Sequence, residues 1–314
     1  MQPSIRRYRN QWRRAHGNPP ARGAAPDAPL LTALPVPADL HIHSTASDGT
    51  LTPAELVRLA RAEGIACVAI SDHDSVDGVA AAAAAAAGAG QGVDVIPAVE
   101  LSAETNGRSV HILGYFIDYS NEGLLAHLAV LRQTRLDRAR ELVRVLADGG
   151  YAISLDDVLA RTTGGSVGRA HVARALVDAG HVPTTGAAFD RLIGRGKPFY
   201  VAKPVASPES VIATIRGAGG IAVLAHPAVS GAEDLIESLR AAGLDGIEVF
   251  HAQQNPTDRA RLLAIAQRLD LLVTGGSDFH GPGEGRTRLG DGGLDDEALD
   301  TFIRLATSRM ERRA

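Results

Sequence analysis

Six of the eleven histidines lie in short motifs that also carry carboxylates or that end a run of apolar residues. Imidazole and carboxylate groups together suit Zn, Mn or Fe ions, and the single Cys67 leaves no thiolate-rich alternative. The nine candidate ligands are too many for one ion, so we expect two or three divalent ions that share a bridging carboxylate. These candidates are His41, His43, Asp48, His73, Glu100, His111, His226, Asp278 and His280.

The alternative interpretation is that each histidine is structural, which is the commoner role of an isolated histidine near a strand end. Motifs such as HxH, AHP and SDFH are weak signals when they occur alone. Gathered on one face without a metal, however, these groups would form a costly cluster of unpaired polar atoms. The combination therefore predicts a polynuclear metal site. Asp72 and Asp74, which flank His73, are expected to orient ligand imidazoles rather than to bind metal.

Short apolar runs alternate with helical segments from Ala38 onward, and this alternation must position the ligands. Strands separated by crossover helices pair in parallel, and seven of them predict a closed or nearly closed β/α barrel. Active sites of such barrels lie at the carboxyl ends of the strands, where every candidate falls except His111, which lies within its strand. His41 and His43 are two residues apart, so both point to one face of a strand. The predicted strands are 38–42, 66–71, 93–99, 109–115, 220–226, 245–250 and 270–276, and the predicted helices are 53–63, 76–89, 208–218, 232–242 and 257–269.

The alternation stops between about residues 118 and 204, where only helical segments occur. These segments are 121–149, 154–160, 168–179 and 185–193. We expect an inserted all-helical subdomain that packs over one end of the barrel. The predicted parts of the chain are a leader (1–37), the first part of the barrel (38–117), the insert (118–204), and the second part of the barrel with a C-terminal helix (205–314).

The composition of the 314 residues is ordinary for a globular protein, with 45% hydrophobic and 22% charged residues. One cysteine excludes a disulfide framework, and no apolar run approaches the roughly 18 residues of a membrane span. The N-terminus also lacks the apolar core of a secretory signal, so we expect a cytoplasmic protein without a membrane partner.

The leader at 1–37 differs from the rest because it carries six arginines and one acidic residue. This composition predicts a disordered basic tail, with a nucleic-acid contact or a misplaced start codon as alternatives. The remainder of the chain is acidic, which argues against binding long nucleic acid through a broad basic face.

The chain resembles the PHP (polymerase and histidinol phosphatase) family in six ordered motifs, over about 38–118 and 205–290. The motifs are DLHIHSTASDGT, AISDHDSVDG, the VE pair at 99–100, VHILGY, LAHP and GSDFHG. The resemblance implies a distorted (β/α)7 barrel with a trinuclear site at the strand ends. A water that bridges two divalent ions loses its proton near neutral pH, so a metal-bridged hydroxide is the expected nucleophile.

The resemblance also implies which residues share each ion. Glu100 bridges two of the ions. The implied sets are His41, His43, Glu100 and Asp278 for the first ion, Glu100, His111 and His226 for the second, and Asp48, His73 and His280 for the third.

The inserted segments VGRAHVARALVDAGHV and GRGKPFYVAKPVAS resemble the insert of PHP phosphoesterases that act on nucleotides. In those relatives the Arg and His of a GR-x-H segment reach the substrate phosphate, which implies catalytic and substrate-binding roles for Arg169 and His171. The two lysines of the chain, Lys197 and Lys203, both lie in GKPFYVAK, and we expect Lys203 to contact substrate. Two surface lysines in a loop are the alternative. His251 is a further candidate for the pocket wall.

The leading prediction is a metal-dependent phosphoric ester hydrolase that acts on a small phosphorylated substrate, a nucleoside 3′,5′-bisphosphate or a mononucleotide. The alternatives are a 5′-to-3′ exoribonuclease on short RNA, a histidinol-phosphate phosphatase, and a non-catalytic PHP module. The nucleotide-type insert disfavours histidinol phosphate. The complete ligand set and the absence of a polymerase-length domain disfavour the non-catalytic module.

Overall fold

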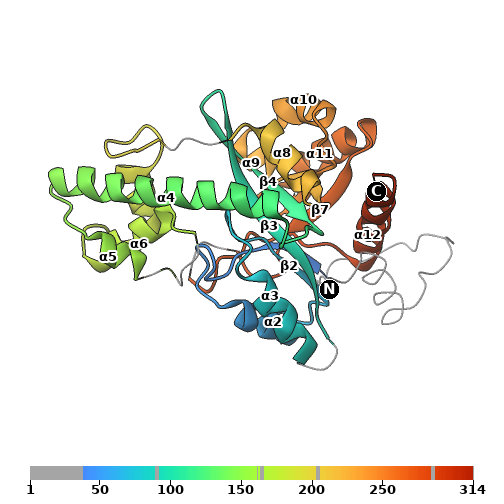
Figure 1. Cartoon of the computed structure of the whole chain (residues 1–314), viewed down its shortest axis with the longest axis horizontal. Helices are drawn as coiled ribbons and strands as arrows, with labels where there is room; N and C mark the ends of the chain where they lie inside the picture. The colour runs from blue at the N-terminus through green and yellow to red at the C-terminus, as the bar shows by residue number, and fades with distance from the viewer. Residues whose placement is uncertain are drawn as a thin grey trace.

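The structure is a computed structural model that describes residues 38–88, 92–160, 162, 166–202, 206–283 and 287–313. It centres on a seven-stranded sheet in which neighbouring strands follow the order of the chain (Figure 1). The strands are β1 (Ala38–Ile42), β2 (Cys67–Ile70), β3 (Asp94–Thr105), β4 (Arg108–Tyr115), β5 (Ile221–Leu224), β6 (Gly246–His251) and β7 (Leu272–Gly276). The leader at 1–37 and Lys203, both subjects of predictions, lie outside the described residues.

Backbone hydrogen bonds join the segment after β7 to β1 and so bring the two edges of the sheet together. The Asp278 amide donates to the His41 carbonyl at 2.8 Å, and the His43 amide donates to the Phe279 carbonyl at 2.9 Å. The sheet is therefore a nearly closed, distorted barrel of seven strands, which confirms the predicted fold class.

The direction of β4 differs from the sequence prediction of an all-parallel barrel. β4 pairs antiparallel with both β3 and β5, while the remaining neighbours are parallel. The cause is a two-residue hairpin at Asn106 and Gly107, whose φ angles are +48° and +70°. An Asn-Gly pair adopts this left-handed turn readily. The hairpin also lengthens β3 to Thr105, so Glu100 lies within the strand and not at its end.

Helices flank the barrel on its outer side, and several begin where the sequence predicted. Thr52, Ser207 and Asn255 each accept a hydrogen bond from the first turn of a helix that starts with proline. The helices are α2 (Pro53–Ala62), α3 (Val79–Gly88), α8 (Pro208–Gly217), α9 (Pro227–Ser230), α10 (Ile236–Ala241), α11 (Pro256–Arg268) and α12 (Asp296–Glu311). The segment predicted as one helix at 232–242 is a 3₁₀ turn, η2 (Glu233–Leu235), followed by α10.

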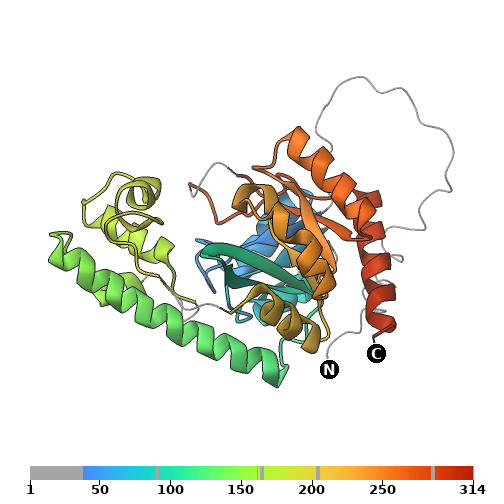
Figure 2. The same ribbon diagram turned by 90° about the horizontal axis from the view of Figure 1, so that it is seen from above.

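The insert consists of consecutive helices between β4 and α8 and stands to one side of the barrel (Figure 2). Its elements are α4 (Glu122–Asp148), α5 (Leu155–Leu159), α6 (Arg169–Asp178), α7 (Thr185–Ala188) and the π-helical turn η1 (Phe189–Ile193). The long helix α4 runs from the barrel to the other helices, with which it shares a core that includes Leu142, Leu146, Val172 and Leu176. The division of the chain at residues 118 and 204 stays a prediction.

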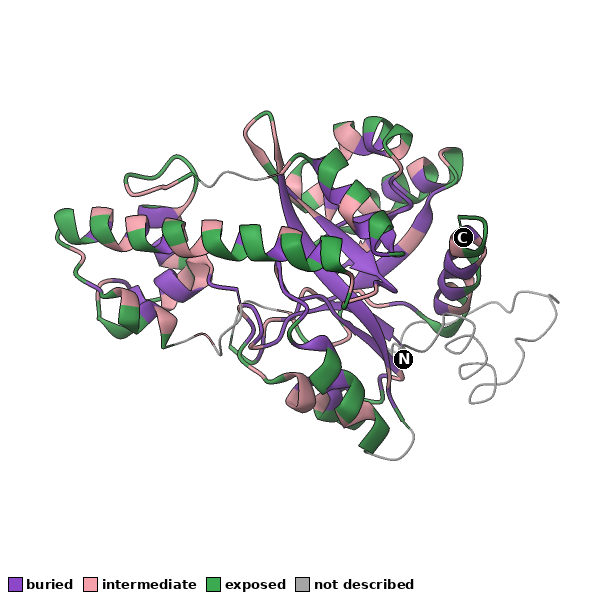
Figure 3. Ribbon diagram, viewed as in Figure 1, coloured by how far each residue is buried: buried purple, intermediate pink, exposed green. Residues whose placement is uncertain are grey.

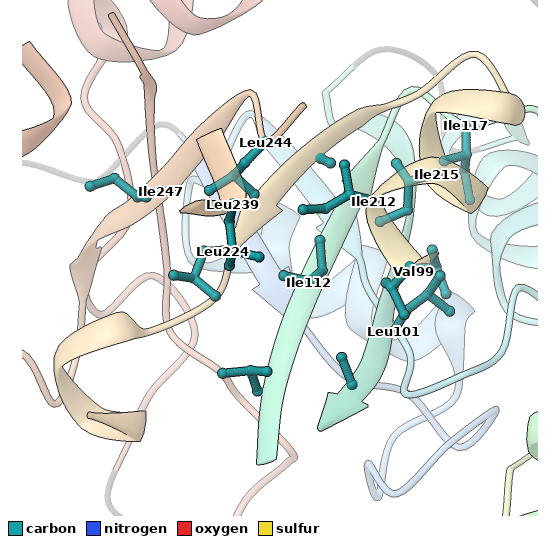
Figure 4. Packing of buried hydrophobic residues seen from close by; sticks show 14 of the residues in the cluster. Val99, Leu101, Ile112, Ile117, Ile212, Ile215, Leu224, Leu239, Leu244 and Ile247 are labelled. Atoms are coloured by element: carbon teal, nitrogen blue, oxygen red, sulfur yellow. The ribbon is translucent and has the colours of Figure 1, made fainter. Parts of the chain in front are cut away.

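Alternating residues of the strands build two apolar layers. Ile96 and Ala98 of β3 point into the barrel, where they pack with Tyr115 and Phe302. Val99 and Leu101 point outward into a second layer with the helices (Figure 4). The strands are mostly buried, whereas the helices expose their outer faces (Figure 3). No helix in the described part of the chain combines the length and apolarity that crossing a membrane requires.

Candidate metal centre

Glu100 lies at the centre of a buried polar cluster at one end of the barrel. It follows Ala98 on the inward face of β3, at the level where the apolar interior ends. Its Oε2 atom lies 2.9 Å from His73 Nδ1, 3.3 Å from His43 Nε2 and 3.4 Å from His41 Nε2. One carboxylate oxygen thus faces three imidazoles from two segments.

The other oxygen of Glu100 faces a second pair of imidazoles. Its Oε1 atom lies 2.9 Å from His111 Nδ1 and 3.3 Å from His226 Nε2. His111 stands opposite Ser102 in the β3–β4 hairpin, and because β4 is antiparallel, its N-terminal half reaches the ligand face. This explains how His111 reaches the ligand face from within its strand. The two oxygens of Glu100 thus face two different sets of imidazole rings, as expected of a carboxylate that bridges two ions.

Asp278 completes the first implied set. Its Oδ1 atom lies 3.1 Å from His43 Nε2 and 3.5 Å from His41 Nε2. Asp278 and His226 both have positive φ angles, of 56° and 31°, which non-glycine residues rarely adopt. Such backbone strain is typical of functional sites, where surrounding structure holds a side chain in place.

The third implied set also comes together, with His43 as an added member. The candidate ligand atoms of His43, Asp48, His73 and His280 all lie within 4.8 Å of one another. Asp48 Oδ1 is 3.3 Å from His280 Nε2, and the rings of His43 and His280 stack with centroids 4.2 Å apart. The structure therefore brings all nine predicted ligands into one cluster of overlapping groups.

His226 Nε2 and Glu100 Oε1 form a hydrogen bond, but most of the other close approaches in this cluster lack hydrogen-bond geometry. Buried polar atoms without partners are costly, and divalent ions between them would satisfy their lone pairs. The residues therefore fit a polynuclear metal centre. The unpartnered atoms in the described part of the cluster include His41 Nε2, His43 Nε2, Asp48 Oδ1, His73 Nδ1, Glu100 Oε2, His111 Nδ1 and His226 Nδ1.

The electrostatics of the cluster also call for cations. Burial works to raise the pKa of Glu100, but neighbouring histidines, His73 first among them, hold that pKa well below its usual range. Burial works to lower the pKa of His280, yet the carboxylate of Asp48 raises it to about 10. Burial and the charge of His280 lower the pKa of His43 to about 3. The carboxylates are therefore ionised at neutral pH, and protons on some rings supply charge that metal ions would replace.

Two further buried residues belong to the site. Glu248 on β6 places Oε1 3.0 Å from His41 Nδ1, and its Oε2 accepts a hydrogen bond from the His226 amide at 2.8 Å. Carboxylates in this position orient ligand imidazoles. The sequence analysis missed Glu248, although an acid inside the apolar strand GIEVF is a signal. His251 Nε2 lies 3.7 Å from Asp278 Oδ2, which places it at the wall of the site.

Asp72 and Asp74, predicted to orient imidazoles, contact serines and an arginine. Asp72 accepts hydrogen bonds of 2.7 Å from both the amide and the hydroxyl of Ser44, in the loop after β1. Asp74 accepts hydrogen bonds from the Ser102 amide at 2.7 Å and from Arg135 Nε at 2.6 Å. Both acids thus fix the backbone segments that carry ligands.

A pocket of about 210 Å³ opens beside the cluster and is bounded by the insert. Arg169 stacks its guanidinium over Phe189 and Tyr200, at 5.5 and 5.8 Å from the ring centroids, and Arg138 lies 5.6 Å from the Tyr200 centroid. Burial and the charge of Arg169 lower the pKa of Arg138 to about 10. Cations held this close together favour an anion between them. The lining residues include Asp48, His73, His111, Arg135, Arg138, Arg169, Phe189 and Tyr200.

The predicted substrate contacts from the insert differ in their placement. Arg169 lines the pocket, as expected of a substrate contact. His171 is fully buried, and its Nδ1 accepts a hydrogen bond from the Gly168 amide at 3.0 Å, so the ring stabilises the start of α6. Lys197 is exposed after η1. The substrate roles of Arg169, His171 and Lys203 stay predictions. Arg138 was missed, because charged residues on a long helix are usually solvated.

A seven-stranded β/α barrel that gathers six imidazoles and three carboxylates at one face defines a metal-dependent hydrolase. The PHP domain model matches residues 39–192. The chain is 40% identical over 258 residues to a 3′,5′-nucleoside bisphosphate phosphatase of Chromobacterium violaceum. The matched region covers 80% of this chain and 90% of the relative. It is 39% identical over 249 residues to a 5′-3′ exoribonuclease of Haemophilus influenzae, across 78% of this chain and 90% of the relative.

A solved structure from Bifidobacterium adolescentis, named as a metal-dependent phosphoesterase, superimposes with a TM-score of 0.79 at 38% identity. The match covers 85% of this chain and 95% of the other. The chain belongs to the PHP family, and it is a metal-dependent hydrolase of phosphate esters.

Proposed function

We propose that the protein hydrolyses phosphate esters of small nucleotides, with a nucleoside 3′,5′-bisphosphate as the preferred substrate. The observation that carries this proposal is the position of Arg138 and Arg169, which line the same pocket as His73 and His111. A substrate with two phosphates can place one at the metal cluster and the other at the arginines. The Chromobacterium violaceum relative is named for a substrate of this kind.

The size of the pocket limits how much of a substrate it can enclose. Its volume of about 210 Å³ is below the range of about 300–1,000 Å³ for sites that enclose drug-sized ligands, so it would enclose part of a nucleotide and not a long polymer. One face is formed by metal-ligand candidates and the other by the insert. A substrate held between them would be bound at two anionic ends.

The positions of the residues support the following roles. Two or three divalent ions, with Mn, Zn or Fe as candidates, would supply the activated water and neutralise the phosphoryl oxygens. Glu100 would hold two ions at a fixed separation. Glu248 would keep the His41 ring oriented toward the ions, and Arg169 and Arg138 would bind and orient the second phosphate. Catalysis of phosphoryl transfer rests mainly on such positioning and charge neutralisation.

A 5′-to-3′ exoribonuclease on short RNA is the second candidate, because the Haemophilus influenzae relative of that name is nearly as similar as the phosphatase. The 5′-phosphorylated end of an RNA needs only a few contacts in the same pocket. Histidinol-phosphate phosphatase lacks such support. A non-catalytic PHP module is disfavoured because seven of the nine ligand candidates form overlapping groups, and His226 and Asp278 contact members of those groups.

The decisive experiment compares substrates on one metal-loaded preparation. Protein stripped with chelator and reloaded with Mn is assayed for phosphate release from a nucleoside 3′,5′-bisphosphate, a mononucleotide, histidinol phosphate and short 5′-phosphorylated RNA. We expect the highest kcat/KM for the bisphosphate and no turnover by stripped protein. Glu100→Gln is the matched control, because it keeps the shape of the side chain but removes the bridging charge. Higher kcat/KM for RNA than for the bisphosphate would favour the exoribonuclease.

A further inference from the structure

The loop at 44–51 carries Asp48, and hydrogen bonds to Asp72 attach it to the barrel. Ser44 donates its amide to Asp72 Oδ1 at 2.7 Å, and the Ser47 hydroxyl donates to the same oxygen at 2.6 Å. The chain doubles back tightly here, because a Cβ on Gly49 would lie 2.2 Å from the His43 carbonyl oxygen. These contacts fix the start of the loop, and none of them involves the backbone of Asp48.

The insert holds the same loop from the opposite side. The Arg174 guanidinium of α6 donates a hydrogen bond to the Asp48 carbonyl at 2.6 Å. The Ser166 amide, just before α6, donates to the Ala46 carbonyl at 3.1 Å. Since the loop carries one ligand candidate of the group His43, Asp48, His73 and His280, the insert reaches this group directly.

We propose that Arg174 is a positioning residue for the metal ion at the group that contains Asp48, so that the insert controls how tightly this ion is held. The inference rests on the proposed function, because it requires metal at the cluster. Residues outside the ligand shell that orient ligands commonly change metal affinity about 10- to 100-fold when they are removed. A charge-assisted hydrogen bond to the ligand's own carbonyl is such a support.

The same helix links this ion to the substrate. Arg169 begins α6 and lines the pocket, while Arg174 lies five residues further along the helix and contacts Asp48. A phosphate that binds Arg169 and an ion that binds Asp48 therefore favour the same position of α6. Two ligands that favour one conformation raise each other's affinity by the same factor. Inorganic phosphate should accordingly tighten binding of this ion.

The test is a Mn titration of metal-free protein, followed by the magnetic resonance signal of free Mn. Arg174→Met keeps the apolar stem and removes the donor, and Arg174→Lys restores one donor. Arg144→Met is the matched control, because Arg144 is exposed on α4 and bonds to Glu141 and Asp148. We expect Arg174→Met to weaken one ion about 10-fold or more, to leave the others unchanged, and to lose the effect of phosphate. Arg174→Lys should recover part of the ion affinity and part of the phosphate effect. Excess Mn should restore kcat in Arg174→Met.

Two outcomes would overturn the proposal. The first is that Arg174→Met binds every ion as tightly as the unaltered protein. The second is that Arg174→Met weakens binding of all ions equally and lowers the melting temperature, which is a purely structural effect. If Arg174→Met does not fold, Arg174→Lys carries the test, and wild-type affinity for every ion with an unchanged phosphate effect counts against the proposal. Less than about one ion per unaltered chain would instead contradict the proposed function.

Discussion

The Nδ1 atom of His41 lies 3.0 Å from Oε1 of Glu248, and both side chains are fully buried. A hydrogen bond here requires the proton on Nδ1, so the Nε2 lone pair of the neutral, metal-binding ring would face Glu100 and Asp278. The second oxygen of Glu248 accepts the His226 amide at 2.8 Å. One carboxylate therefore sets the tautomer of one ligand candidate and the backbone of another.

Glu248→Gln should weaken metal binding although Glu248 itself lies outside the predicted ligand set. The amide keeps the shape but removes the charge that favours a proton on His41 Nδ1, so we expect a loss of about 10- to 100-fold in affinity for one ion. Metal titration of the stripped protein measures this. Glu237→Gln is the control, since Glu237 is exposed and pairs with Arg268. Unchanged affinity in Glu248→Gln would mean that this hydrogen bond does not orient the ligand.

Metal binding at neutral pH should release protons. The carboxylate of Asp48 opposes the effect of burial and raises the pKa of His280 to about 10, so metal-free protein carries a proton there at pH 7. An ion must displace that proton, and affinity should rise with pH. Calorimetry in buffers of different ionisation enthalpy should detect release of at least about one proton per chain. Binding with no proton exchange at pH 7 would exclude His280 as a ligand.

The same pKa shift predicts how the stability of the metal-free protein depends on pH. The raised pKa of His280 stabilises the fold at pH values below the ordinary value of 6.5, and this contribution is lost as the pH rises through about 10. The melting temperature of stripped protein should therefore fall over this range. Metal-loaded protein should show less change, because the ion replaces the proton.

The clustering of the nine candidate ligands could be predicted from the sequence because each lies in a short motif in or next to a strand, and barrel geometry gathers strand ends at one face. The direction of β4 was predicted wrongly even though Asn106-Gly107 is a hairpin signal, since the surrounding helices suggested a uniform β/α alternation. Glu248 was not predicted because a single acid in a strand has no partner at a fixed distance along the sequence. Its contact with His41 joins residues far apart in the chain.

The arginines of the pocket show a different limit of prediction from sequence. Arg138 of α4 and Arg169 of α6 both lie over Tyr200 because α4 packs against the other helices of the insert, and no local pattern encodes that arrangement. Arg169 was predicted through a motif shared with relatives, whereas Arg138 has no such motif. Sequence patterns thus located the candidate metal ligands more completely than the residues that line the pocket.

Arg138→Ala should separate recognition of two phosphates from hydrolysis of one. Arg138 is expected to bind the phosphate that is not cleaved, so KM for a nucleoside bisphosphate should rise about 10- to 100-fold, with a smaller change for a mononucleotide. Bound metal should stay constant. Arg132→Ala on the same helix is the control, because Arg132 is exposed and pairs with Asp77. An equal loss for both substrates would show that Arg138 does not distinguish them.

Removal of residues 2–37 should separate small substrates from RNA. The leader carries six arginines, whereas the rest of the chain is acidic, so longer RNA has its clearest basic partner there. Each RNA phosphate neutralised contributes about 0.7 to the salt slope of binding, which makes the contribution measurable. We expect hydrolysis of a nucleoside bisphosphate to stay nearly unchanged, while activity on longer RNA falls and depends less on salt. Replacing the six leader arginines by glutamine in the full chain should reproduce the effect if charge is the cause. A truncated protein that still prefers RNA to the bisphosphate at moderate salt would identify the exoribonuclease as the correct function.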